Sequence, residues 1–398
     1  MRLGRNTSFY LLASIILFFL AGSSAPTPLY AVYQAAWGFS PIMVTVVFGI
    51  YALAVLVTLL VVGSLSDHVG RRPVLLAATL VQAVTMILFI TADGLPTLIA
   101  ARIIQGLATG AAAGAVGAGM LDLDRAKGTT ANAVAPMLGT ATGALLSGLF
   151  VQFLPAPTVV VYAVLGAIYL VQFAGVLAMP ESVTRRPGAL ASLRPHFAVP
   201  PRLRAALLVA APALVAAWAL AGFYGSLGPM LVRRLLDSHS LSLGGLTLGT
   251  LAASGALAVY LMRTWPARTV MTFGTSALAI GVAFTLAAIP THSALIFFTG
   301  AILAGAGFGG AFQGAIRMVV PEAKPHERAG VLSIVYVIAY LAMGLPAVLG
   351  GVRVVHGGGV ITTAREYGIA VMVLAIAALA GALLHRAPIL APAAPHRQ

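Results

Sequence analysis

The amino-acid sequence predicts an all-α integral membrane protein with 12 transmembrane helices, arranged as two pseudo-symmetric six-helix bundles. Composition is the first reason, because 60% of the 398 residues are hydrophobic, only 8% are charged and the mean hydropathy is +1.01. A soluble domain carries charge on about a quarter of its residues. The other two reasons are the length of the apolar runs and a single long polar connection near the middle of the chain.

A helix that crosses the hydrocarbon core of a bilayer needs about 20 mostly apolar residues. Twelve such runs lie between charged, proline or glycine breaks: 8–29, 41–63, 74–92, 96–120, 130–154, 158–179, 205–232, 241–262, 269–290, 292–318, 330–353 and 366–385. The polar loop 181–204 separates an N-terminal bundle, 1–180, from a C-terminal bundle with a short tail, 205–398. Two equal halves indicate an internal duplication, a common plan in secondary transporters.

The first span resembles a secretory signal peptide, because Arg2 and Arg5 precede an apolar run that ends in Ala-Gly-Ser-Ser-Ala. We expect it to stay uncleaved, since cleavage would leave an odd number of spans. The Lys and Arg residues of the connections then give the orientation. Eighteen lie on the side of both termini and the loop 181–204, and four lie on the other side. We therefore expect both termini in the cytoplasm.

Several other classes of protein are excluded by what the sequence holds. The net charge of +14 would suit a nucleic-acid partner, but the basic residues lie in short bursts between apolar runs, as in membrane proteins. The absence of cysteine excludes disulfides and thiolate sites. The sequence has no catalytic or metal-binding pair, no Walker A loop and no repeated filter. We therefore expect neither an enzyme, nor an ATP-driven pump, nor a channel. We also expect no cofactor, metal or nucleic acid as a partner. A non-transporting receptor on the same fold stays open.

Two motifs lie at specific places on these spans. The connection between spans two and three reads Gly63-Ser-Leu-Ser-Asp67-His68-Val-Gly70-Arg71-Arg72. Glycine permits a tight turn, and an aspartate there can pair with an arginine or cap the next helix. In span four, Arg102 lies about 9 Å from the outer end of the helix, at 1.5 Å per residue from Pro96. A charge at that depth normally faces a cavity or a partner, although snorkelling to the interface is the alternative.

Both motifs resemble those of the major facilitator superfamily, which implies the major facilitator fold. The loop is similar to the signature loop of that family, with His68 in place of the usual Arg or Lys. The resemblance implies a gating role in alternating access for the matching residues Gly63, Asp67, Gly70, Arg71 and Arg72. The span-four pattern Arg102-Ile-Ile-Gln105-Gly resembles a conserved motif whose arginine is linked to proton coupling. We therefore assign Arg102 and Gln105 to coupling.

Span five carries Gly139, Gly143 and Gly148 in a pattern that resembles the antiporter motif of drug-exporting members. Ala144 and Ser147 depart from that motif. Small residues every fourth position also let helices pack closely without any family role. The resemblance implies a bacterial 12-helix drug/proton antiporter, whereas close packing alone would explain the glycines.

None of the nine acidic residues lies in the middle of a span, so a midplane carboxylate that carries protons is absent. If protons drive transport, Asp67, Asp122 or Asp124 must take part, and Arg102 modulates them. Facilitated diffusion remains the alternative. Polar and aromatic residues within apolar spans are the candidates for the substrate cavity: Asn132, Trp218, Tyr224, Gln313, Tyr336 and Tyr340.

Each of these candidates alone is more often a packing residue than a ligand contact, but together they describe an apolar cavity with few polar groups. We therefore expect a monomeric carrier in a bacterial inner membrane that exports small hydrophobic or amphipathic compounds in exchange for protons. Transport of a metabolite such as a sugar, an amino acid or a siderophore-like compound is the alternative.

Overall fold

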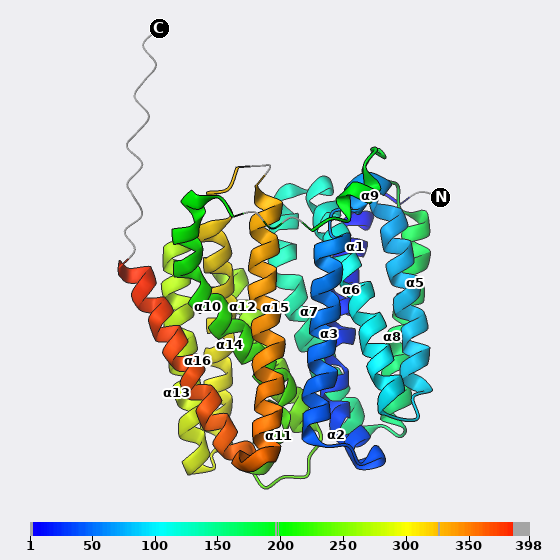
Figure 1. Cartoon of the computed structure of the whole chain (residues 1–398). Helices are drawn as coiled ribbons and strands as arrows, with labels where there is room; N and C mark the ends of the chain where they lie inside the picture. The colour runs from blue at the N-terminus through cyan, green and yellow to red at the C-terminus, as the bar shows by residue number, and fades with distance from the viewer. Residues whose placement is uncertain (1–2, 196, 198, 325–326, 385–398) are drawn as a thin grey trace.

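A computed structural model describes residues 3–195, 197, 199–324 and 327–384, and all regular elements in these residues are helices (Figure 1). The long helices run side by side along one axis. The start of the first helix and the end of the last helix lie on the same side of the molecule, which we call the terminal side. The other end of the bundle is the opposite side. The multi-span all-helical fold predicted from the sequence is confirmed.

The first half consists of α1 (Arg5–Ser24), α2 (Pro26–Trp37), α3 (Pro41–Val62), α4 (Ser66–Val69), α5 (Arg71–Ile90), α6 (Leu95–Leu123), α7 (Arg125–Phe153) and α8 (Pro157–Ala178). A short helix, α9 (Ala189–Ser192), lies in the connection between the halves. The second half consists of α10 (Pro201–Ser226), α11 (Gly228–Leu235), α12 (Ser242–Leu261), the 3₁₀ turn η1 (Met262–Thr264), α13 (Ala267–Thr291), α14 (Ala294–Val319), α15 (Arg328–Arg353), the π turn η2 (Val354–Gly358) and α16 (Gly359–Leu384).

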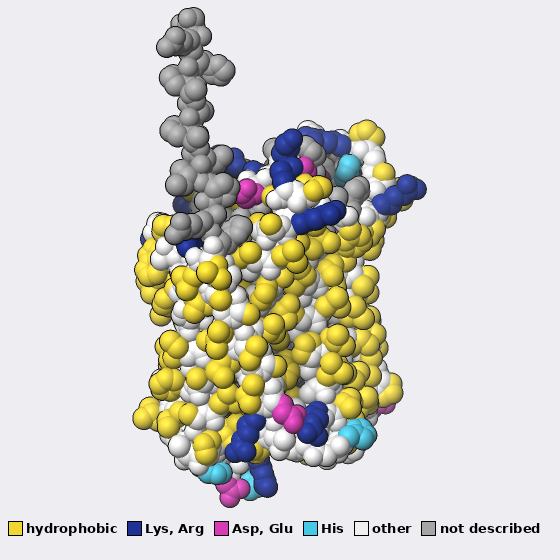
Figure 2. Space-filling model, turned by 60° about the vertical axis from the view of Figure 1, so that its left-hand side comes forward, with side chains coloured by type: hydrophobic (Ala, Val, Ile, Leu, Met, Phe, Trp, Pro, Cys, Tyr) yellow, Lys and Arg dark blue, Asp and Glu magenta, His cyan; other side chains and the backbone are white. Residues whose placement is uncertain are grey.

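By length and hydropathy, the described residues contain 11 helical stretches able to cross a membrane. The last of these, Arg328–Leu384, is 57 residues long and includes a turn with non-helical backbone at His356 and Gly357. The chain reverses at this turn, so that α15 and α16 run in opposite directions (Figure 1). Counting these two separately gives the 12 crossings expected from the sequence. Hydrophobic side chains cover the middle of the face drawn in Figure 2, with Lys and Arg near its two ends.

Two spans that the sequence suggested as continuous are broken near the opposite side. The predicted span 8–29 divides at Ala25 into α1 and α2, and 205–232 divides at Leu227 into α10 and α11. A backbone N–H normally bonds to the carbonyl four residues earlier, and proline has no N–H. Pro26 and Pro28 therefore leave the carbonyls of Gly22 and Ser24 without their helical donors. Corresponding breaks in the two halves support the internal duplication.

Each half has its own hydrophobic core. One core is built from residues between Phe9 and Met179, and the other mostly from residues between Leu203 and Ala382. The halves meet where α3 packs against α15 and α7 packs against α12. The boundary between the cores coincides with the connection that contains α9, so this long polar connection links two separately packed bundles.

Several close contacts between the halves lie near the opposite side. A Cβ atom at Gly245 of α12 would be 2.3 Å from the Ala144 carbonyl oxygen and 2.8 Å from Gly148 Cα, both in α7. A Cβ atom at Gly351 of α15 would be 2.2 Å from Thr45 Oγ1 of α3. Helices that approach this closely require residues without a Cβ at the contact. The halves are therefore pressed together on the opposite side.

Candidate functional site

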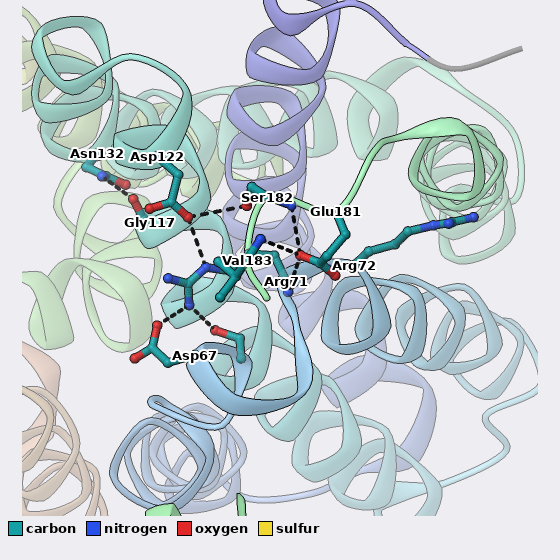
Figure 3. A network of polar contacts seen from close by, with 10 residues as sticks. Asp67, Arg71, Arg72, Gly117, Asp122, Asn132, Glu181, Ser182 and Val183 are labelled. Atoms are coloured by element: carbon teal, nitrogen blue, oxygen red, sulfur yellow. Dashed lines mark hydrogen bonds and ion pairs between the residues drawn. The ribbon is translucent and has the colours of Figure 1, made fainter. Parts of the chain in front are cut away.

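The terminal side carries a network of charged groups centred on Arg71, the first residue of α5 (Figure 3). The Arg71 side chain is 7% exposed, and its Nε atom donates to Asp122 Oδ2 at the end of α6 over 3.2 Å. Its Nη1 atom donates to Ser66 Oγ at 2.7 Å and pairs with Asp67. A buried guanidinium thus joins the loop between α3 and α5 to the end of α6, through two carboxylates.

A third carboxylate, Glu181, caps the start of α5. Its two oxygens accept the backbone N–H groups of Arg71 at 2.8 Å and Arg72 at 3.0 Å. Helix N-termini leave such N–H groups without partners and favour anions. Gly70 makes the approach possible, because its φ is +103° and a Cβ atom there would be 2.4 Å from Glu181 Oε2. The glycine of the motif is therefore explained by both backbone conformation and contact.

Arg72, unlike Arg71, binds the end of a helix, and an arginine of the second half makes the same kind of contact. Its Nε donates to the Val176 carbonyl at 3.1 Å, and its Nη2 donates to the Leu177 carbonyl, at the end of α8. In the second half, Arg268 of α13 donates to the Ala382 carbonyl at 3.2 Å and to the next carbonyl at 2.8 Å, at the end of α16. The same contact therefore recurs in the second half, although the turn 263–268 shares little with the loop 63–72 besides Arg268.

The connection between the halves is attached to the loop between α3 and α5. His68 Nδ1 lies 3.0 Å from the Pro187 carbonyl oxygen, and the Arg186 N–H donates to the His68 carbonyl at 2.9 Å. Ser64 Oγ donates to the Ser192 carbonyl of α9 at 3.1 Å. His68, which departs from the family pattern, thus binds the backbone of the connection.

The residues assigned to coupling lie in separate places. Asp122 belongs to the network around Arg71, whereas Asp124 caps α7 by accepting the Lys127 N–H at 3.0 Å. That hydrogen bond lowers the pKa of Asp124 from its usual value. Arg102 and Asp122 both lie on α6, about 30 Å apart at 1.5 Å per residue. Any coupling between them must pass through movement of helices, because they share no contact.

Arg102 is 1% exposed and sits at the broken end of α1. Its Nη1 atom donates to the Ser23 carbonyl at 3.0 Å and to Gln105 Oε1 at 2.6 Å. Gln105 in turn donates through Nε2 to the Gly22 carbonyl at 3.0 Å, which is the carbonyl that Pro26 leaves without a donor. The C-terminal end of a helix carries partial negative charge, so it suits a cation. The break in α1 therefore creates the site for Arg102.

Aromatic rings complete the surroundings of Arg102. Its guanidinium carbon lies 4.1 Å from the centroid of the Tyr51 ring in α3, a cation–π contact. Among the described residues, no ion pair involves Arg102, and its Nε atom is buried without a hydrogen-bond partner. The positive charge is thus held by carbonyl dipoles and a ring rather than by a carboxylate.

The three glycines of span five are packing positions in this structure. Cβ atoms at Gly139 and Gly143 would lie 2.1 Å and 2.0 Å from the carbonyl oxygens of Leu17 and Ala21 in α1. Gly148 faces the second half, where a Cβ atom would be 3.0 Å from Gly245 Cα. Close packing of small residues accounts for the pattern. The motif fixes α7 between α1 and α12.

Three of the cavity candidates gather on the second half. The Trp218 ring in α10 lies 5.4 Å from the Tyr340 ring and 5.2 Å from the Phe312 ring, and its Nε1 atom is buried without a partner among the described residues. Tyr336 precedes Tyr340 by one turn of α15, and both are half-buried. Phe48 of the first half belongs to the same cluster. This aromatic cluster bridges the two halves.

The other three candidates lie elsewhere. Tyr224 is buried in the core of the second half, with its hydroxyl 3.0 Å from Thr285 Oγ1 of α13. Asn132 donates to the Gly117 carbonyl at 3.0 Å and joins α7 to α6 (Figure 3). Gln313 is half-buried on α14. The structure thus separates Tyr224 and Asn132 from the aromatic cluster, because each is engaged in packing within its own half.

Sequence reasoning overlooked Glu181, Tyr51 and Phe48. Glu181 had a detectable signal, since it is one of only nine acids and directly follows a span. Tyr51 and Phe48 had no such signal, because span two has no polar face that would show which of its residues point toward the other helices. Among the described residues, no three His, Cys, Asp or Glu side chains gather closely enough to hold a metal ion.

Comparison with known proteins agrees with this geometry. The sequence profile of the Major Facilitator Superfamily matches residues 11–262. A crystal structure of a variant of the nucleoside transporter NupG superposes with a TM-score of 0.72 at 12% identity, covering 95% of this chain and 100% of that one. A second NupG structure gives a TM-score of 0.68 at 13% identity, with 96% and 99% coverage. The chain belongs to the major facilitator superfamily and is a multi-pass secondary transporter of the membrane, not an enzyme.

Proposed function

We propose that this chain exports small amphipathic compounds across a bacterial inner membrane in exchange for protons. The observation that carries the proposal is Arg102, a cation buried within α6 and joined to α1 and α3 without a carboxylate. Burying a charge inside a membrane span is costly, so such residues are commonly functional. Its contacts depend on the break in α1, and any movement of α1 relative to α6 changes them.

The aromatic cluster supports an amphipathic solute. Trp218, Tyr340 and Phe48 present ring surfaces at the junction of the halves, and the buried Trp218 Nε1 atom offers a hydrogen-bond donor. Apolar walls with few polar groups are typical of sites for small organic molecules. A solute bound there touches both halves and senses their relative movement.

The network around Arg71 supports a link to protons. The charge of Asp122 holds Arg71 near the end of α6, and Asp67 holds it near α4. A proton on either carboxylate would remove the attraction of that carboxylate for Arg71 and weaken the connection between the start of α5 and its neighbours in the first half. The contacts near Gly245 join the two halves on the opposite side, and an alternating-access cycle requires these contacts to open while the terminal side closes.

The orientation follows from charge. Of the 23 Lys and Arg residues, 18 fall in the sequence segments assigned to the side of the termini and of the loop 181–204, and such residues accumulate on the cytoplasmic side. The terminal side therefore faces the cytoplasm. We also propose that the protein acts as a monomer. The state with a closed opposite side is the one that receives solute from the cytoplasm.

Transport in inside-out membrane vesicles tests the role of Arg102. We expect Arg102→Ala to reduce energised uptake of amphipathic dyes at least about tenfold, because at least 1.4 kcal/mol of charge-assisted contacts is lost. Arg185→Ala, which changes an exposed arginine of the connection, is the matched control. Unchanged uptake in a folded Arg102→Ala protein would exclude this mechanism.

Transport of a metabolite is the second candidate. The aromatic cluster also suits stacking on a planar ring such as a nucleobase, and the two similar structures are nucleoside transporters. Thermal stabilisation of the purified protein by a panel of dyes, nucleosides, sugars and amino acids distinguishes the candidates, because a ligand stabilises the folded state that it binds.

A further inference from the structure

A pocket lies on the terminal side, where the start of α1 meets the turn between α6 and α7. We call it the terminal pocket. It has a volume of about 410 Å³, and its charged lining residues are Arg5, Asp124, Arg125 and Lys127. Three cations and one carboxylate give this lining a net charge of +2. Sites for small molecules typically hold about 300–1,000 Å³, so the terminal pocket has room for a small anionic group.

Hydrogen bonds bring these residues together. Arg5 Nε donates to the Leu123 carbonyl at the end of α6 over 2.7 Å, and Arg5 Nη2 donates to the same carbonyl. Asp124, the next residue, accepts the Lys127 N–H at 3.0 Å. Its Oδ2 atom lies 3.5 Å from Lys127 Nζ. The terminal pocket is therefore a place where α1, α6 and α7 are joined.

Two of the three cations have no carboxylate partner. In the part of the chain that the structure describes, neither Arg5 nor Arg125 forms an ion pair. The acid in the lining, Asp124, pairs with Lys127 instead. A guanidinium can donate two parallel hydrogen bonds to a phosphate. A phosphate in the terminal pocket would therefore meet two guanidinium groups that no carboxylate neutralises.

The terminal pocket lies at the level where a bilayer has its headgroups. Tyr10 lines the pocket and is 65% exposed, and tyrosine gathers at the interface between membrane and water. Arg5 precedes Tyr10 on α1 by about 7.5 Å toward the terminal side, at 1.5 Å per residue. The cations of the pocket therefore lie just outside the interfacial tyrosine, as the phosphates of a lipid leaflet do.

The face of α7 that contains Lys127 is turned toward lipid. Lys127, Leu138 and Leu149 follow one another at about three turns of 3.6 residues, so they lie along one side of the helix. Leu138 is 44% exposed and Leu149 is 46% exposed. Large exposed apolar side chains on a membrane span are suited to contact with acyl chains. A lipid whose chains cover these leucines would have its headgroup near the terminal pocket.

We propose that the terminal pocket binds the headgroup of an anionic phospholipid, with Arg5 and Arg125 as donors to its phosphate. Basic pockets between transmembrane helices hold lipid headgroups in this way. The acyl chains would pass Tyr10 and the exposed leucines of α7. Bound lipid would join the start of α1 to the start of α7 and stabilise the first half. This inference goes beyond the proposed transport and does not depend on the solute.

Native mass spectrometry and thermal shift of the purified, delipidated protein in a neutral detergent test the proposal with three probes. Phosphatidylglycerol is anionic, phosphatidylcholine with the same acyl chains is zwitterionic, and glycerol 3-phosphate is a headgroup without chains. We expect phosphatidylglycerol to bind at least about fivefold more tightly than phosphatidylcholine, since each basic residue near an anionic lipid changes binding by about that factor. Equal binding of the two lipids would overturn the proposal. Stabilisation by glycerol 3-phosphate equal to that by phosphatidylglycerol would indicate a site for soluble phosphate and contradict a lipid site.

Variants that remove one charge locate the binding. Arg5→Gln and Arg125→Gln should each weaken phosphatidylglycerol binding about fivefold. Arg204→Gln is the matched control, because Arg204 is an exposed arginine in the first turn of α10 and lies outside the lining. Equal losses in all three variants would mean that the lipid responds to the overall charge of the protein, and would refute the terminal pocket. If Arg5→Gln fails to fold, Arg125→Gln still decides, because the Arg125 side chain makes no hydrogen bond within the described residues.

A fourth variant should bind lipid more tightly. Asp124→Asn removes the negative charge of the terminal pocket and keeps a residue that can cap α7. Phosphatidylglycerol binding should therefore strengthen about fivefold, whereas phosphatidylcholine binding should stay the same. A loss of stability alone cannot produce tighter binding, so this result separates the charge from a structural effect. Unchanged or weaker binding of phosphatidylglycerol to folded Asp124→Asn would contradict the proposal.

Discussion

Substitution of Gly245 by alanine should open the opposite side. The new Cβ atom would be 2.3 Å from the Ala144 carbonyl oxygen, about 1.1 Å short of the 3.4 Å at which ordinary contact begins. Overpacking of this kind costs about 1–3 kcal/mol. Because the clash exists only while α7 and α12 are pressed together there, the cost falls on the state that is closed on the opposite side. The equilibrium should therefore shift about 5–150-fold toward the state that is open there.

The natural lack of cysteine makes this shift measurable. Ser226→Cys introduces a single thiol at a position that is 3% exposed, at the end of α10 near the opposite side. The rate of its reaction with a membrane-impermeant maleimide should rise about 5–150-fold in Gly245→Ala. Gly94→Ala is the matched control, because the nearest atom to its Cβ would be Pro96 Cδ at 3.7 Å.

A second reporter, Ser333→Cys on the terminal half of α15, distinguishes gating from loosening. If the halves alternate, its reaction should slow as that of Ser226→Cys accelerates. Faster reaction at both positions would mean that Gly245→Ala merely destabilises the fold. An unchanged rate at Ser226→Cys in a folded protein would refute the assignment of the glycine contact as the closed gate.

Three further predictions concern the terminal side. Gly70→Ala should lower the Tm and the transport rate, because its φ of +103° is strained for alanine and the new Cβ meets Glu181; an unchanged Tm would contradict this. Arg72→Gln and Arg268→Gln should each cost about 1–3 kcal/mol in unfolding experiments, since each loses two hydrogen bonds to helix-end carbonyls; very unequal losses would argue against the repeat. Asp124→Ala should lower the Tm at neutral pH. Because the folded pKa of Asp124 is lowered, its stabilisation is present above the unfolded value of 3.8 and lost as the pH falls through the folded pKa, so the two proteins should converge in acid. A difference in Tm that is independent of pH would exclude the charge as its cause.

Hydropathy was sufficient to predict the spans, because every crossing helix must satisfy its backbone within an apolar run. It could not predict the breaks at Ala25 and Leu227. The prolines beside them were visible in the sequence, but proline is also common in unbroken transmembrane helices, as Pro136 inside α7 illustrates. Predicting the break at Ala25 would require knowing which side chain donates to the free Gly22 carbonyl. That donor, Gln105, reaches the carbonyl only in the folded protein.

The site was predicted in part for similar reasons. Arg71 and Arg102 were found because charge near or inside a span is rare. Their different partners could not be foreseen, since Asp122 and Tyr51 come from other helices and no sequence spacing relates them. Tyr224 looked like a cavity residue because it is polar at one end, but its partner in α13 draws it into the core.

The most direct test of the proposed exchange is the pH inside proteoliposomes that contain the purified protein. When a transported amphipathic compound is added to one side, proton-linked exchange predicts a pH change in the lumen that a protonophore abolishes. The same change should be lost in Arg102→Ala and retained in Arg185→Ala. Transport of the compound with a constant lumenal pH, at a rate that the protonophore leaves unaltered, would contradict the proton link and identify a facilitator.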